Sequence, residues 1–359
     1  MFEKDYVLLD GGRVFLNKEF TEKLVTIERL VFDCDGVLIN TNNSYRKTIK
    51  QTLSIIFKPF PQKKIIGFTE IEKLKFTGIY NNDWDSTYAL ALFLFTTLSK
   101  DQTRSLINWL KNKNIEPSTV DRVGPVDLEY ENFLKNIRGD PIGDPEKYAE
   151  EVCVKNGTCE ELKEFIELIG KPLNVRESFL AKAFDAIYYG ERLFKRIYNM
   201  NPPVNVKKGN IEVEKLYVKK STLSTLKKLF DHKMYLLTGR SRISVEYKIE
   251  NLQEYFDVEK SFFIEDIVRE GCTNVNELKK PSPTPLLQLA CDQPTLYVGD
   301  ATEDLLLAKK AKESSQNIFF AGIIAENNNA VKKYFIESNA DLILSNVNML
   351  QKVFKNRCG

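Results

Sequence analysis

A chain of 359 residues is long for a single compact core, so two domains are expected. A hydrophobic fraction of 43% with only 13 prolines excludes a disordered or fibrous protein. The 52 basic and 50 acidic residues leave a formal charge of +2, so no overall field by itself indicates a nucleic acid or a membrane as partner. Neither partner is expected, and any other has to be inferred from local sites.

The first residues predict neither a secretion signal nor a site. Residues 1–5 are charged where a signal peptide would be apolar. Residues 8–12 place Asp10 between an apolar run and two glycines, and this lone acid favours a β-hairpin turn ahead of the core. The six cysteines contain no CxxC pair, which suits a reducing, cytoplasmic environment. A disulfide between Cys153 and Cys159 is left open, with free thiols favoured.

Residues 30–32 form the first strong strand signal and lead directly into Asp33-Cys34-Asp35-Gly36. Asp-Gly is a common turn pair, so the two acids could merely begin a turn. A functional interpretation competes with this one, because ligands of a parallel sheet bind beyond the carboxyl ends of its strands.

From residue 42 to residue 233 the sequence changes texture and becomes rich in Lys, Glu, Leu, Phe and Tyr at helical spacing. Breaks near residues 58–61, 139–145 and 201–203 suit loops or hinges. These features predict a mainly helical domain at 42–205, inserted into a core domain of 1–41 plus 206–359 in which 1–27 is an N-terminal extension. Residues 86–99 hold no charge, but 14 residues fall short of the ~20 that span a bilayer, so a buried helix is expected there.

Directly before that helix, residues 78–85 form the densest polar and aromatic cluster of the insertion. Asp83 or Asp85 could be a helix N-cap with Trp84 as a packing residue. Alternatively, the segment is a loop that reaches over the substrate and contacts it through Asn82 and Trp84. Arg46 likewise either binds an anionic group of the substrate or lies on a solvated helix face.

After the insertion, further apolar runs predict strands at 234–237, 261–264, 295–298, 318–323 and 340–344. Helical patterns separate them at 243–252 and 303–312. Continuous apolar strands that alternate with helices predict an α/β fold with a doubly wound parallel sheet covered on both faces. The single histidine, His232, precedes a strand and is expected in a surface turn. One histidine excludes a two-histidine phosphatase site and a histidine-rich zinc site, so carboxylates are expected to do the chemistry.

Polar motifs follow this strand pattern. Thr238-Gly239-Arg240 follows the run at 234–237, Lys279-Lys280-Pro281 comes later, and Gly299-Asp300 with Asp304 follows the run at 295–298. In this order, and together with Asp33-Cys34-Asp35-Gly36, they resemble the four motifs of the haloacid dehalogenase superfamily. The likeness covers roughly residues 28–41 and 215–359. By position, the insertion resembles the helical cap of subfamily I phosphatases, although it is longer. Residues 81–84 (NNDW), with Ser44-Tyr45-Arg46, resemble an uncharacterised branch of these phosphatases.

The resemblance implies a Mg²⁺-dependent phosphatase that forms an aspartyl-phosphate. Asp33 would be the nucleophile and Asp35 the general acid and base. Thr238 and Lys280 would complete the catalytic set, with Lys279 as the rival for the lysine. Gly239 and Arg240 would bind the substrate, with the backbone N–H groups near Gly239 donating to its phosphoryl oxygens. Mg²⁺ would be bound by Asp33, by the backbone carbonyl of Asp35 and by Asp300. Asp304 would also belong to the metal site, but would mainly orient a metal-bound water or Lys280.

The acid at position 35 favours phosphoryl transfer over dehalogenation, because a halide leaving group needs no proton. The expected substrate is a small phosphorylated metabolite. A phosphomutase, which uses the same motifs, and a non-catalytic binding or regulatory protein on this fold remain as alternatives. The sequence does not predict the oligomeric state.

Overall fold

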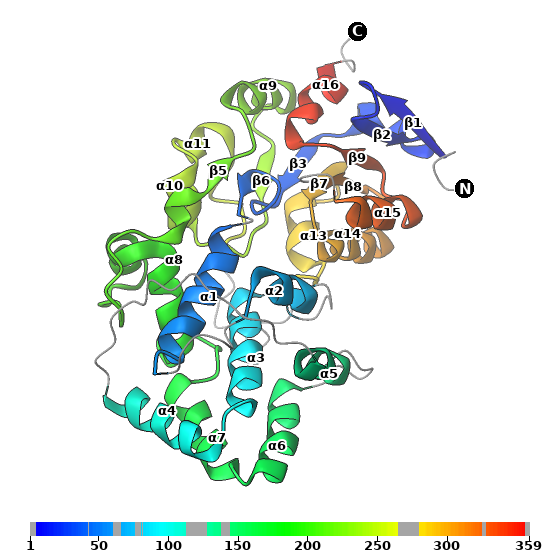
Figure 1. Ribbon diagram of the computed structural model, residues 1–359. Helices are drawn as coiled ribbons and strands as arrows, with labels where there is room; N and C mark the ends of the chain where they lie inside the picture. The colour runs from blue at the N-terminus through cyan, green and yellow to red at the C-terminus, as the bar shows by residue number, and fades with distance from the viewer. Residues whose placement is uncertain are drawn as a thin grey trace. The chain divides into compact units, whose positions relative to one another are not determined.

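The computed structural model describes residues 5–41, 43–59, 66–75, 80, 82–112, 128–137, 144–264, 280–324 and 328–355. The chain forms two compact units (Figure 1). Unit 1 comprises residues 1–41 and 215–359, and unit 2 comprises residues 42–214. The sequence places the second crossing at 205. In the structure Asn210 and Glu214 still bond within unit 2, Asn210 to Thr48 Oγ1 at 2.9 Å and Glu214 to Tyr188 at 2.7 Å.

Unit 1 is built on a seven-stranded, mostly parallel sheet with the strand order β1-β2-β9-β8-β7-β3-β6. The strands are β1 (Tyr6–Leu9), β2 (Val14–Asn17), β3 (Arg29–Phe32), β6 (Met234–Leu236), β7 (Thr295–Gly299), β8 (Ile318–Ile323) and β9 (Leu342–Leu344). The last five run parallel to one another, whereas β1 and β2 form an antiparallel hairpin at one edge, and β2 also pairs antiparallel with β9. The predicted fold class and the predicted hairpin are both confirmed.

Helices cover both faces of this sheet. Leu30 and Phe32 of β3 pack into one apolar cluster with side chains from α9 (Lys220–Phe230) and α16 (Leu350–Lys355). Val31 packs into the other cluster, with α13 (Thr284–Ala290), α14 (Thr302–Ser314) and α15 (Asn329–Glu337). Alternate residues of an all-apolar strand therefore serve two cores, as expected for a doubly wound fold.

Two predicted elements of unit 1 differ from the structure. The predicted strand at 261–264 is reduced to an isolated bridge between Leu237 and Phe262. The predicted helix at 243–252 is split into α10 (Arg242–Lys248) and α11 (Leu252–Tyr255), because Asn251 between them takes the left-handed conformation with φ of 53°. His232 lies exposed in a turn, as predicted.

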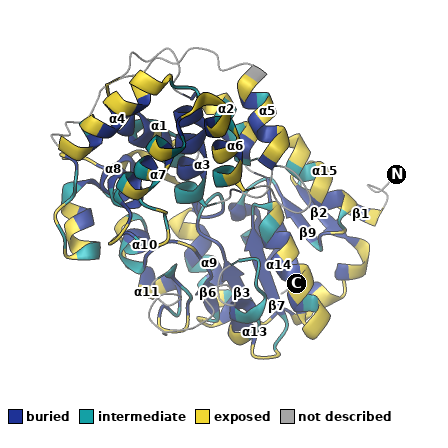
Figure 2. Cartoon of the chain, turned by 90° about the horizontal axis from the view of Figure 1, so that it is seen from below, coloured by how far each residue is buried: buried dark blue, intermediate teal, exposed yellow. Residues whose placement is uncertain are grey.

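Within the described residues of unit 2, all regular secondary structure is helical. Its helices are α1 (Ser44–Ile56), α2 (Phe68–Lys75), α3 (Asp83–Thr96), α4 (Lys100–Asn112), α5 (Leu128–Ile137), α6 (Pro145–Asn156), α7 (Cys159–Ile169) and α8 (Phe179–Tyr198). Helix α3 is buried from Ser86 to Thr96, which confirms the predicted buried helix (Figure 2). Among the described residues, no helix is long and apolar enough to cross a bilayer.

A second, small sheet lies beside the two chain crossings. Strands β4 (Ile39–Asn40) and β5 (Lys215–Leu216) pair antiparallel, so the chain segments that enter and leave unit 2 are hydrogen-bonded to each other. Both strands belong to unit 1. Cys153 and Cys159 are free thiols, which confirms the favoured interpretation.

Candidate active site

Three neighbouring strands bring the predicted site residues of unit 1 to one edge of the sheet. In β3, Phe32 pairs with Leu236 of β6 on one side and with Val298 of β7 on the other. The Asp33 N–H continues this ladder with a bond of 2.9 Å to the Val298 carbonyl. Because the strands are parallel, the polar residues that follow them meet at their carboxyl ends.

Three carboxylates form the centre of the site. Asp33, Asp300 and Asp304 each offer one oxygen atom, and these atoms lie within 4.8 Å of one another. The Lys280 Nζ lies 3.0 Å from Asp33 Oδ1 and 2.9 Å from Asp304 Oδ1. The structure thus brings together four residues from three separate segments of the sequence. Lys279, the rival for the lysine, lies outside the described residues.

The Asp304 carboxylate already has donors on both oxygens. Its Oδ1 accepts bonds from Lys280 and from the Tyr297 hydroxyl at 2.6 Å, and its Oδ2 accepts the N–H groups of Asp300 and Ala301 at 3.2 and 3.1 Å. Asp304 is therefore better placed to hold the lysine and the Asp300 loop in position than to act as a direct metal ligand. Sequence reasoning missed Tyr297. A tyrosine in a buried strand needs a partner for its hydroxyl, and that requirement was the available signal.

Burial and mutual repulsion raise the pKa of the acids in this cluster. Burial, followed by the charge of Asp304, raises the pKa of Asp33 to about 7, although Lys280 opposes the shift. Burial and the charges of Asp304 and Asp33 raise the pKa of Asp300 well above its ordinary value. Burial alone would lower the pKa of Lys280, but the same two carboxylates raise it well above the usual range.

This charge balance provides a test of whether the residues fit a metal ion. Three buried or partly buried carboxylates face one ammonium group, so the cluster has an excess of negative charge that a divalent cation would offset. The donors are all hard oxygen atoms, and Mg²⁺ prefers such ligands. The residues of this site therefore fit the metal that the sequence resemblance implies.

Two glycines allow the loops of the site to approach one another. Gly36 has φ of +73°, and a Cβ at this position would lie 1.8 Å from Asp300 Oδ2. A Cβ on Gly299 would lie 2.4 Å from the Cβ of Asp304. The glycines of both acidic motifs are thus required by close packing, Gly36 against Asp300 in the loop after β7 and Gly299 against Asp304 in the first turn of α14.

Gly36→Ala is therefore expected to disrupt the site. The new methyl group would displace Asp300 and strain a left-handed backbone, so any Mg²⁺-dependent activity of the protein should fall at least about tenfold, and the free energy of unfolding should fall by roughly 1–3 kcal/mol. Gly11→Ala is the matched control, because Gly11 has φ of +67° but no atom within 4 Å of its Cβ position. Steady-state kinetics and urea unfolding of both variants check the expectation. Equal activity in the two variants would contradict it.

The loop after β6 carries Thr238, Gly239 and Arg240. Thr238 is buried, its N–H bonds to the Phe262 carbonyl at 3.1 Å, and its Oγ1 accepts the Arg240 N–H at 3.2 Å. A Cβ on Gly239 would meet no atom within 4 Å, so the surface there is open. The Arg240 side chain is buried and bonds to the Asp35 carboxylate.

The predicted substrate contacts of the insertion have partners within unit 2. Asn82 is the N-cap of α3, because its Oδ1 accepts the N–H groups of Trp84 and Asp85 at 2.8 and 3.3 Å. The suggestion that Asp83 or Asp85 is the cap was wrong: both lie in the first helical turn, where their charge suits the helix dipole. Trp84 donates to Asp185 Oδ1 at 2.8 Å. Arg46 forms an ion pair with Glu72 at 2.6 Å.

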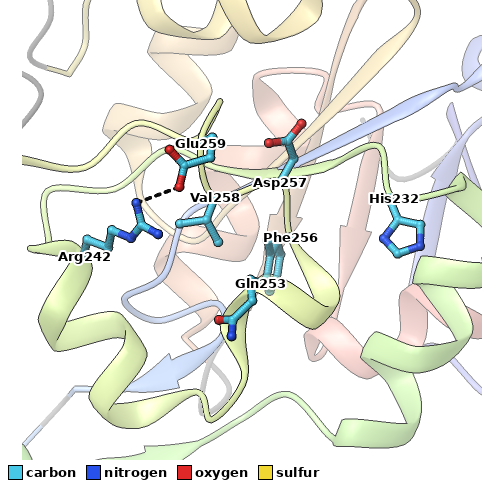
Figure 3. A pocket seen from close by; sticks show the side chains of 7 residues that line it. All are labelled: His232, Arg242, Gln253, Phe256, Asp257, Val258 and Glu259. Carbon is cyan, nitrogen blue, oxygen red and sulfur yellow. Dashed lines mark hydrogen bonds and ion pairs between the residues drawn. The ribbon is translucent and has the colours of Figure 1, made fainter.

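A shallow pocket of about 310 Å³ lies elsewhere in unit 1 (Figure 3). It is lined by His232, Arg242, Gln253, Phe256, Asp257, Val258 and Glu259. The guanidinium group of Arg242 forms ion pairs with Glu246 and Glu259, each at 3.0 Å. The pocket contains no predicted site residue and is not the candidate active site.

Known proteins resemble the chain at the level of family and fold. The family model of haloacid dehalogenase-like hydrolases matches residues 27–312. No curated protein matches the sequence. The solved structure of the phosphatase Tt82 from Thermococcus thioreducens has 19% identity and a TM-score of 0.54, with 92% of this chain and 99% of that chain covered. An X-ray structure of a Northeast Structural Genomics Consortium target has 15% identity and a TM-score of 0.62 over 92% and 99% of the two chains. At these identities the two structures show a shared fold.

Proposed function

The chain belongs to the haloacid dehalogenase-like hydrolases, and we propose that it is a Mg²⁺-dependent phosphomonoesterase acting on a small phosphorylated metabolite. The observation that carries this proposal is the cluster of Asp33, Asp300 and Asp304 around Lys280, with Asp35 two residues from Asp33. A nucleophilic carboxylate beside a fixed ammonium group suits attack on a phosphate ester.

In the first step, an Asp33 oxygen attacks phosphorus while the bond from phosphorus to the ester oxygen breaks. The Asp35 carboxyl group gives its proton to that ester oxygen, so the alcohol leaves neutral. The product on the protein is an aspartyl-phosphate at Asp33. The Lys280 ammonium, 3.0 Å from Asp33 Oδ1, and the Thr238 hydroxyl would donate to the phosphoryl oxygens.

In the second step, the Asp35 carboxylate takes a proton from a water molecule whose oxygen attacks phosphorus. The bond between phosphorus and Asp33 breaks, inorganic phosphate leaves, and Asp35 is protonated again for the next cycle. Asp33, Asp300 and the backbone carbonyl of Asp35 would hold Mg²⁺, which when bound neutralises the acids and the phosphate and polarises a phosphoryl oxygen.

Unit 2 would act as a cap that selects the substrate, with Asn82, Trp84 and Arg46 as the proposed contacts. Its insertion directly after the Asp33 loop supports this role. The cysteines of the described residues, which include the free thiols Cys153 and Cys159, agree with action in the reducing cytoplasm.

The purified protein is expected to release phosphate from 4-nitrophenyl phosphate with Mg²⁺, to stop with EDTA, and to recover when Mg²⁺ is added back. Asp300→Ala should raise the Mg²⁺ concentration needed for half-maximal activity by about 10–100-fold, because it removes a carboxylate ligand. Glu313→Ala, an exposed acid at the other end of α14, should leave that concentration unchanged. Full activity in a metal-stripped sample would overturn the proposed mechanism, and no turnover with Mg²⁺ would favour a binding protein.

A further inference from the structure

The Arg240 guanidinium is an unusual feature of this site because it is buried and faces an acid of the catalytic loop. Its side chain is only 2% exposed, whereas the Asp35 side chain that it contacts is 32% exposed. The Arg240 Nε donates a hydrogen bond to Asp35 Oδ1. A fixed, buried donor thus contacts a carboxylate at the solvent-facing end of its loop.

The fold places Arg240 at this point with little freedom. Phe32 pairs with Leu236, and Asp35 and Arg240 follow these two residues on adjacent parallel strands. The Arg240 N–H bonds to Thr238 Oγ1 at 3.2 Å, and its carbonyl accepts the Ile264 N–H at 3.0 Å. The next residue, Ser241, caps α10 through a bond from the Ser244 N–H at 3.2 Å. The backbone on both sides of Arg240 is therefore held by hydrogen bonds.

The two acids of the first motif consequently have separate cationic partners. Asp33 faces Lys280 at 3.0 Å, and Asp35 faces Arg240. A carboxylate that is one-third exposed could rotate into solvent, and a rigid guanidinium fork restricts that rotation more than a flexible lysine would. We propose that Arg240 is a positioning residue that fixes the Asp35 carboxyl group for proton transfer to and from the leaving oxygen and the attacking water. This role rests on the proposed phosphatase function.

The contact is compatible with both halves of the reaction. A carboxylate accepts an N–H bond on either oxygen, and a protonated carboxyl group still accepts one on its carbonyl oxygen. Arg240 can therefore keep its bond to Oδ1 while the proton leaves and returns at the other oxygen. The direct substrate contact that the sequence predicted for Arg240 stays a prediction, because the guanidinium group has N–H donors besides the Nε that bonds to Asp35.

Two aryl phosphates separate these roles, since they place the same kind of ring in the site but differ in leaving group. The phenolate released from phenyl phosphate is strongly basic and needs a proton, whereas the phenolate from 4-nitrophenyl phosphate is a far weaker base. The measured quantity is the ratio of kcat/KM for phenyl phosphate to kcat/KM for 4-nitrophenyl phosphate. In Arg240→Met this ratio should fall about tenfold or more, within the ~10²–10⁴ that general acid catalysis contributes. Arg240→Lys should recover part of that ratio. In an Asp35→Asn background, Arg240→Met should leave the ratio unchanged, because the group that it positions is gone.

Arg242→Met is the matched control. Arg242 lies two residues further on and is 43% exposed. It pairs with Glu246 and, at the surface pocket, with Glu259 (Figure 3). The ratio and the melting temperature of Arg242→Met should equal those of the wild type.

Two results for Arg240→Met would overturn the proposal. A raised KM with an unchanged ratio would make Arg240 a phosphate ligand, and a raised kcat/KM for phenyl phosphate would make it a restraint on Asp35. Equal losses on both esters with a lowered melting temperature would reduce Arg240 to a structural role. If the wild type turned over neither ester, the phosphatase function itself would fall.

Discussion

Asp33→Asn is expected to abolish phosphate release from every phosphate ester while the protein stays folded. The amide has the same shape as the carboxylate but cannot attack phosphorus, so the loss should reach several orders of magnitude. Phosphate release at saturating Mg²⁺, with far-ultraviolet circular dichroism to verify the fold, checks this result. Mass spectrometry of acid-quenched enzyme should also show a phosphorylated peptide containing Asp33 in the wild type and none in the variant.

Cys34→Ala is the matched control for that experiment. Cys34 lies between the two acids but packs into the apolar cluster on one face of the sheet. Burial raises the pKa of its thiol far above the ordinary value, so the thiol does not compete as a nucleophile. We expect the control to keep most of the activity at a modest cost in stability. Activity of Asp33→Asn within tenfold of the wild type would remove Asp33 from the nucleophile role.

The clustering of the candidate site residues in unit 1 could be predicted because these residues follow strand ends. Continuous apolar runs mark the parallel strands, and the register of a parallel sheet then forces the residues after them to one edge. Asp33 and Asp300 come together in this way. The glycines at 36 and 299 belong to the same signal, since the first makes room for Asp300 and the second for Asp304.

Side-chain partners were less accessible to sequence reasoning. The bond from Arg240 to Asp35 and the bond from Tyr297 to Asp304 join residues whose partners depend on three-dimensional register and burial. Local patterns report which face a residue occupies, and they do not report which polar atom it meets. The same limit explains why the sequence analysis considered Asp83 or Asp85 as a possible cap of α3, whereas Asn82 makes the capping bonds.

The insertion shows a second limit. Helical periodicity predicts that unit 2 is helical and that α3 is buried, because both follow from spacing and apolarity. The partners of Trp84 and Arg46 could not be predicted in this way. Trp84 bonds to Asp185 on α8, about a hundred residues later in the chain, and Arg46 pairs with Glu72 on α2. A specificity role for either side chain now has to be reconciled with a bond that it already makes.

The metal-free protein is expected to lose stability as pH rises from about 4 through about 7. Each unit contains a buried aspartate whose pKa burial raises to about 7, namely Asp33 in unit 1 and Asp185 in unit 2. An acid whose pKa is higher in the folded than in the unfolded state stabilises the fold fully at pH values below its pKa in the unfolded state. This stabilisation is lost as the pH rises through its pKa in the folded state. For Asp185 alone the change is on the order of 4 kcal/mol, from about 1.4 kcal/mol for each pH unit between 3.8 and about 7.

Single substitutions should assign these two contributions. Asp185→Asn should flatten one part of the pH dependence of the unfolding free energy, because an amide does not ionise. The amide can keep both contacts of the wild-type carboxylate, since its oxygen can accept from Trp84 and its nitrogen can donate to the Tyr198 hydroxyl. Asp33→Asn should flatten the part that Asp33 contributes, while Asp300, whose pKa is also raised, keeps its own contribution. Guanidinium unfolding of the EDTA-treated protein between pH 5 and pH 8.5 measures both.

Saturating Mg²⁺ provides the decisive comparison for the same series. If the metal binds the ionised acids of unit 1 as proposed, it should remove the contribution of Asp33 while the contribution of Asp185 persists. A wild-type curve that rises toward pH 8.5 without metal would show that neither aspartate is held protonated in the folded protein. If Mg²⁺ instead flattened the Asp185 contribution as strongly as that of Asp33, the two units would share one ion-dependent equilibrium, and the buried acid of unit 2 would belong to the metal response.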